Sequence, residues 1–131
     1  MRAALPVTLA AVALAPSLAV APALADVACD GAGDDLAVLD CLRGEYRLAD
    51  DELNRLWPQV LAEAPSGGDP DMHRQAIRDA QRAWIAFRDA DCAASSTIGI
   101  PRYWEMNRLR CTIDHTRART EALARTYGLR R

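Results

Sequence analysis

The segment Ala80–Cys92, AQRAWIAFRDADC, is the part of the chain from which the fold is most readily predicted. Its spacing sets an apolar stripe against a charged face, which is the pattern of an amphipathic helix. The stripe comprises Ile77, Ala80, Trp84 and Phe87, and the charged face comprises Arg78, Arg82, Arg88, Asp89 and Asp91. We predict a helix over about Asp71–Ala93 that is capped by Asp71. Trp84 and Phe87 are predicted to lie in its core seam.

Two further helices follow from apolar residues that alternate at spacings of three and four. The upstream seam is Leu39, Leu42, Tyr46, Ala49, Leu53, Leu56 and Val60, and the downstream seam is Met106, Leu109, Ile113, Thr116, Thr120, Leu123 and Tyr127. The first helix should span about Asp34–Leu61 with Asp34 and Asp35 at its start, and Pro58 should kink it or end it early. The last should run from near Tyr103 to a cap at Gly128. The fold class predicted is an all-α, antiparallel three-helix bundle.

The first 25 residues have the pattern of a cleaved secretory signal peptide. Arg2 is followed by an apolar run, and Ala23-Leu24-Ala25 is a small-x-small cleavage site. Residues 26–131 are then a single helical domain, periplasmic or secreted, with no membrane span. A lipoprotein is the alternative because Cys29 lies near the junction, but Asp26 stands three residues before it, where an apolar residue is usual.

Charge argues against one class of partner. The chain has 16 basic and 18 acidic residues and a net charge of −2, and every basic residue is arginine. Nucleic acid is excluded as a partner because its binding needs clustered positive charge on a basic protein. Arg74, Arg78 and Arg82 recur every four residues. We expect this stripe to pair with the acidic run 50–52 on the neighbouring helix, because like charges at that spacing repel.

Four cysteines in a short exported chain indicate two disulfides. We favour Cys29–Cys41 and Cys92–Cys111, because each pair closes a short loop between a helix and the segment that leads into it. A Cys41–Cys92 bond is the alternative, since antiparallel neighbours bring the start of one helix near the end of the next. No C-x-x-C spacing is present, so neither a metal site nor a cofactor is predicted.

Catalysis is not predicted either. His73 and His115 are the only histidines, and neither has carboxylates spaced as in a metallohydrolase helix. The serine and threonine cluster at 95–97 lacks a G-x-S-x-G context. Asn54 and Gln81 lie beside seam positions, and we expect them to hydrogen-bond each other or backbone near Pro58.

Three blocks of the chain, Asp40–Trp57, Ala80–Cys92 and Cys111–Leu123, resemble the LprI-type lysozyme-inhibitor domain family of small exported helical proteins. The matching residues, called here the motif residues, are Leu53, Asn54, Gln81, Arg82, Trp84, Arg88, Asp89, Cys92, Cys111 and Arg119. The resemblance implies that these residues define the fold. It also implies that the protein binds lysozyme and blocks the hydrolysis of peptidoglycan.

The functional prediction is therefore an inhibitor of lysozyme-type peptidoglycan hydrolases. A non-inhibitory periplasmic interaction or envelope-stress module is the alternative. The candidate contacts with a muramidase partner are Arg102, Trp104 and Arg110, which lie near the end of the bundle where we expect the disulfides. Trp and Arg dominate the energetics of protein interfaces, and arginine can pair with the carboxylates of a lysozyme cleft.

Overall fold

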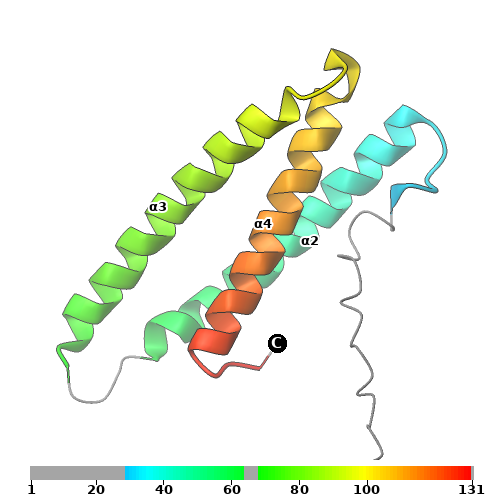
Figure 1. Ribbon diagram of the computed structural model, residues 1–131. Helices are drawn as coiled ribbons and strands as arrows, with labels where there is room; N and C mark the ends of the chain where they lie inside the picture. Colours follow the sequence, from blue (N-terminus) through cyan, green and yellow to red (C-terminus); the bar gives the residue numbers. More distant parts are fainter. Residues whose placement is uncertain (1–28, 64–67, 131) are drawn as a thin grey trace, which may run out of the picture.

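The computed structural model describes residues 29–63 and 68–130. It contains helix α2 (Asp35–Ala62), helix α3 (Pro70–Ser96), the short 3-10 helix η1 (Pro101–Tyr103) and helix α4 (Trp104–Thr126). The described residues contain no strand, so the all-α prediction is confirmed. Consecutive helices run in opposite directions, and α4 lies between α2 and α3 (Figure 1). The predicted signal peptide, residues 1–25, lies outside the described part of the chain.

The helix ends follow from local capping. The Asp34 side chain accepts a hydrogen bond from the Ala37 N–H at 3.0 Å and begins α2, as predicted. Asp69, and not Asp71, caps α3, because Pro70 occupies the first helical position, where its fixed φ fits and its missing N–H costs nothing. Gly128 has a φ of 63° and ends α4, while Leu129 donates to the carbonyl of Ala124 at 2.9 Å.

Helix α2 continues through Pro58 to Ala62. The prediction that the helix could end at the proline was therefore wrong. Only one intrahelical hydrogen bond is lost at a proline. Val60, two residues from the end, is fully buried against Leu56 and Leu123, and this packing stabilises the last turn of the helix.

Helix α4 is the centre of the bundle and packs against both α2 and α3. Every residue of the two predicted seams in α2 and α4 is buried or half-buried. The core has an upper cluster at the disulfide end, built on Leu42, Ala49 and Ile113, and a lower cluster that includes Leu56, Val60 and Leu123. Both clusters join α2 to α4, which explains why the two seams could be predicted from apolar spacing alone.

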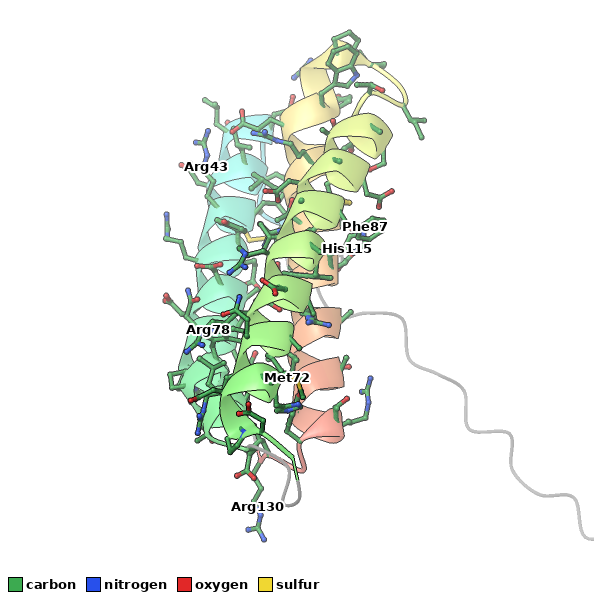
Figure 2. All side chains as sticks on the ribbon, turned by 90° about the vertical axis from the view of Figure 1, so that its left-hand side faces the viewer. Arg43, Met72, Arg78, Phe87, His115 and Arg130 are labelled. Atoms are coloured by element: carbon green, nitrogen blue, oxygen red, sulfur yellow. A yellow bond between two sulfur atoms is a disulfide. The ribbon has the colours of Figure 1, made fainter. Side chains whose placement is uncertain are left out.

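The apolar stripe predicted for α3 is partly wrong. Ile77 is buried and Trp84 is half-buried, but Ala80 is exposed and Phe87 is 56% exposed. Phe87 makes an edge-to-face contact with His115, with ring centroids 5.6 Å apart, on the outside of the bundle (Figure 2). The buried face of α3 instead contains Ile77, Gln81, Arg88, Cys92 and Ser96.

Candidate functional site

Both disulfides lie at the end of the bundle that carries the α3–α4 connection. The bonds are Cys29–Cys41 and Cys92–Cys111, with Cα–Cα distances of 5.7 and 5.5 Å, so the favoured pairing is confirmed. Cys92–Cys111 joins α3 to α4 just below their connection, and Cys29–Cys41 ties the segment before α2 to that helix. This end of the molecule, called here the tip, is held by covalent bonds on both sides.

The candidate partner contacts lie at this tip, in two different settings. Arg102 forms an ion pair with Asp35 between η1 and the start of α2, yet its side chain remains 68% exposed. Arg110 donates to Asp30 at 2.7 Å and is largely covered, so it fixes the segment that precedes α2. Trp104 is partly exposed at the first residue of α4. Arg102 and Trp104 are therefore accessible to a partner, and Arg110 supports the tip from within.

Apolar side chains that the sequence reading did not single out surround these contacts. Ile98 and Ile100 are 75% and 63% exposed in the turn that follows α3, and Leu36 is exposed at the start of α2. The two isoleucines lie in the turn between the end of α3 and Pro101. Their apolar character could not be assigned to a buried face from helical spacing, because this segment is not helical. Exposed apolar side chains gathered at one end of a small domain are typical of an interaction surface.

The buried polar residues of α3 form one network with α4. Arg119 donates from Nε to the Gln81 side-chain oxygen at 3.0 Å, and burial lowers the pKa of its guanidinium. Arg88 donates to Thr116 at 3.3 Å and to Asp89 at 2.9 Å. The guanidinium carbons of Arg88 and Arg119 lie 5.1 and 5.7 Å from the centroid of the Trp84 ring, within cation–π range.

Five motif residues, Gln81, Trp84, Arg88, Asp89 and Arg119, thus contact one another in a single cluster. Thr116 and Thr120 of α4 are fully buried beside it and donate their hydroxyls to the carbonyls of Thr112 and Thr116, one turn earlier. Each buried polar group in this cluster has a partner, so the cluster joins α3 to α4 beside the apolar contacts of Ile77.

Two predicted contacts are not formed. Arg74 pairs with Asp71, and Arg82 pairs with Asp79, each three residues away on α3, so these two arginines do not build a ladder with the acidic run on α2. Asn54 donates to Asp50 at 2.9 Å, and Gln81 accepts from Arg119, so the two amides do not bond each other. The two cases have different reasons. The arginines and Asn54 have carboxylates one turn away in their own helices, whereas Gln81 faces Arg119 of α4.

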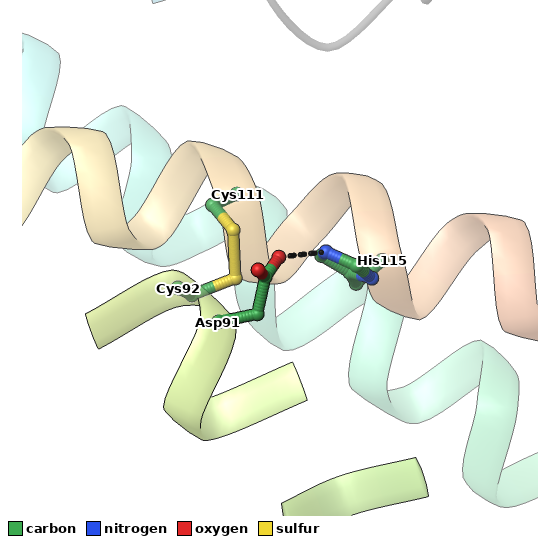
Figure 3. Close-up of side chains that lie close together, drawn as sticks. All are labelled: Asp91, Cys92, Cys111 and His115. Carbon is green, nitrogen blue, oxygen red and sulfur yellow. Dashed lines mark hydrogen bonds and ion pairs between the residues drawn. A yellow bond between two sulfur atoms is a disulfide. The ribbon is translucent and has the colours of Figure 1, made fainter. Parts of the chain in front are cut away.

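One group of side chains resembles a metal-ligand set. Ligand atoms of Asp91, Cys92, Cys111 and His115 lie within 4.8 Å of one another (Figure 3). Both sulfurs are bonded to each other, however, and a metal requires free thiolates. The remaining pair, His115 Nε2 and Asp91 Oδ2 at 3.0 Å, offers fewer ligands than a zinc site uses. In the oxidised protein this group therefore joins α3 to α4 through a disulfide and a hydrogen bond.

The geometry defines a small, disulfide-bonded helical protein with a braced tip and a polar α3–α4 layer. The chain belongs to the lysozyme inhibitor LprI family, whose model matches residues 28–123. It is also similar to the Uncharacterized protein YecT of Escherichia coli (strain K12), at 32% identity over 98 residues, covering 66% of this chain and 60% of the relative. The chain thus spans less than two thirds of that relative's length. No solved structure matches it. Among the helices of residues 29–130 that the structure describes, none has the length and apolar character to cross a bilayer.

Proposed function

We propose that this protein is an exported inhibitor of lysozyme-type muramidases and that the tip is its contact surface. Membership of the lysozyme inhibitor LprI family supports the class of partner. Two disulfides in a short chain suit an oxidising compartment, which supports a periplasmic or secreted location. The observation that carries the choice of surface is the exposed apolar side chains on the covalently braced tip.

Rigidity favours the tip over the rest of the surface. A surface that is already ordered loses little conformational entropy when it binds, so more of the contact energy appears as affinity. The Cys92–Cys111 bond and the Arg102–Asp35 ion pair hold the connection that carries Ile98 and Ile100. Ile98 and Ile100 can therefore enter a cleft without first being ordered.

The charges near the tip suit a lysozyme-type cleft. Lysozyme hydrolyses glycosidic bonds with a pair of carboxyl groups in its cleft. Arg102 is an exposed cation close to the apolar turn, and its guanidinium has five donors, so it can bind a carboxylate of the partner beside Asp35. Trp104 follows two residues later and supplies the kind of aromatic anchor that often dominates protein interfaces.

The test is a turbidity assay of cell-wall lysis by lysozyme in the presence of excess purified protein. The tip variant Ile98→Ser/Ile100→Ser should lose inhibition, because both side chains are exposed and their removal leaves the core intact. The matched control is Met72→Ser, an equally exposed apolar residue at the opposite end of α3. Undiminished lysis with the unaltered protein in molar excess would reject inhibition. Equal inhibition by tip and control variants would reject the tip as the contact surface.

A further inference from the structure

A groove runs between α2 and α3 where neither helix is covered by the other. Both helices pack on α4, which leaves two hollows of about 340 and 370 Å³ along the groove, and Arg88 lines both. Each volume lies at the lower end of the range for small-molecule sites. Figure 2 views the molecule with α3 in front and α2 beside it, with Arg78 between them. The groove lies along the body of the bundle and is distinct from the tip.

The motif residues converge on the 340 Å³ hollow. Six of them line it: Leu53, Asn54, Gln81, Arg82, Trp84 and Arg88. Gln81 and Arg88 also hold α3 to α4, but Asn54 and Arg82 are exposed and bond only to Asp50 and Asp79 in their own helices. Asn54 and Arg82 therefore do not join the helices, and both line the groove, where a ligand could reach them.

Three arginines line the groove, and two of them are paired with acidic residues. Arg82 forms an ion pair with Asp79 and Arg88 with Asp89, and Arg78 is the third. Arg78 is exposed and has no hydrogen-bond or ion-pair partner among the residues that the structure describes. A guanidinium in that state is free to bind a carboxylate, with two parallel hydrogen bonds where the geometry allows.

The lining favours a saccharide over a peptide. Helical walls already use their backbone hydrogen bonds, so an extended peptide would find no strand edge, and an amphipathic helix would need an apolar floor. The groove instead offers planar amides and guanidiniums, at Asn54 and Arg82, which match the donor and acceptor pattern of sugar hydroxyls. Trp57 and Ile85 add apolar surface for the ring of a sugar.

We propose that the groove between α2 and α3 binds an acidic saccharide, with Arg78 on its carboxylate and Trp57 against a sugar ring. The site is separate from the tip and does not depend on inhibition of lysozyme. A protein that failed to inhibit lysozyme could still bind the saccharide, so the two proposals fail independently. Binding should weaken as salt is added, because the charged contacts are solvent-accessible.

The test uses two disaccharides that differ in one group. N-acetylglucosaminyl-N-acetylmuramic acid carries a lactyl carboxylate, and di-N-acetylchitobiose has the same ring skeleton without it. Isothermal titration of the purified, oxidised protein should give at least threefold tighter binding of the acidic disaccharide. Arg78→Gln should weaken its binding roughly three- to tenfold, the range expected for one partly exposed charged contact. Arg125→Gln, which removes an exposed arginine outside the groove, should leave the affinity unchanged.

The three tryptophans give a second readout. Trp57 and Trp84 line the groove, and Trp104 lies at the tip, so only the first two indole N–H signals should shift in an NMR titration with the acidic disaccharide. The proposal is overturned if neither disaccharide binds at millimolar concentration, if both bind equally, or if Arg78→Gln binds as the unaltered protein does. Shifts confined to Trp104 would place the ligand at the tip and would also overturn it.

Discussion

The hydrogen bond between Arg119 and Gln81 gives the sharpest test of the polar layer between α3 and α4. We predict that Arg119→Met destabilises the protein and that adding Gln81→Met recovers part of the loss. Gln81 is only 8% exposed and accepts from Arg119 at 3.0 Å. Removing the arginine alone leaves a buried amide without that partner. Removing both polar groups leaves an apolar contact in the same space.

The magnitude follows from the contacts. An unsatisfied buried amide costs about 1–3 kcal/mol. Loss of the cation–π contact between Arg119 and Trp84, at 5.7 Å, adds about 0.5–1 kcal/mol. Methionine keeps most of the packing of the arginine stem, so no cavity adds to these two contributions. We expect Arg119→Met to lower the free energy of unfolding by about 2–3 kcal/mol, and the double variant to recover about 1–2 kcal/mol of that loss.

Urea unfolding of the oxidised protein measures these differences, since a change in midpoint at constant slope is a change in stability. The control is Arg125→Met, whose side chain is 72% exposed on the same helix and should change stability by less than about 0.5 kcal/mol. The reasoning is refuted if the effects of Gln81→Met and Arg119→Met simply add. It is also refuted if Arg119→Met is as mild as the control.

Three further substitutions separate core, covalent and backbone contributions. Phe87→Ala should cost less than about 1 kcal/mol by urea unfolding, because the ring is 56% exposed, and a loss of 3–5 kcal/mol would indicate a core residue. Removing the Cys92–Cys111 bond by a double alanine substitution should lower stability by about 3 kcal/mol, because the bond closes a loop with a sequence separation of 19, and an unchanged unfolding midpoint would contradict this. Gly44→Ala should stabilise the protein by about 0.5–1 kcal/mol, since an added Cβ in α2 meets nothing within 4 Å. Gly128→Ala should destabilise it by about 1–2 kcal/mol, because a φ of 63° disfavours a residue with a Cβ. A higher melting temperature for Gly128→Ala than for Gly44→Ala would refute this.

The sequence predicted α2 and α4 well because these helices pack against each other through apolar faces. Each predicted seam has seven residues spaced by three and four, and every one of them is buried or half-buried. The period of the pattern and the face that is buried therefore coincide. The favoured disulfide pairing was also right, because each bond joins parts of the chain that are near in sequence. Cys29–Cys41 joins α2 to the segment before it, and Cys92–Cys111 joins α3 to α4 across their short connection.

Helix α3 was predicted less well because the face that it buries is partly polar. Hydrophobicity placed Phe87 in the core, but α3 packs mainly against α4, so only a narrow strip of its surface is covered. Gln81 and Arg88 can be buried in that strip because each forms a hydrogen bond with α4. Gln81 accepts from Arg119, and Arg88 donates to Thr116. Apolar spacing in one helix does not report partners on another, so such a strip could not be identified from α3 alone.

The contacts that shape the tip and the groove were beyond sequence reasoning for a related cause. Arg102 pairs with Asp35, and Arg110 pairs with Asp30, across wide separations in the sequence. The sequence contains many acidic residues that could pair with either arginine. The partner of each is determined only when α2 packs beside α4. The groove likewise exists because α2 and α3 share α4 and leave their facing sides open.

Five polar motif residues divide into two groups once their partners are known. Gln81, Arg88 and Arg119 lie in the polar layer, where each contacts the neighbouring helix or a residue that does. Asn54 and Arg82 are exposed and bond only within their own helices, so they contribute little to holding the bundle together. Gln81 and Arg88 of the first group line the same groove as Asn54 and Arg82, so residues that hold α3 in place lie beside the surface that we propose as a binding site.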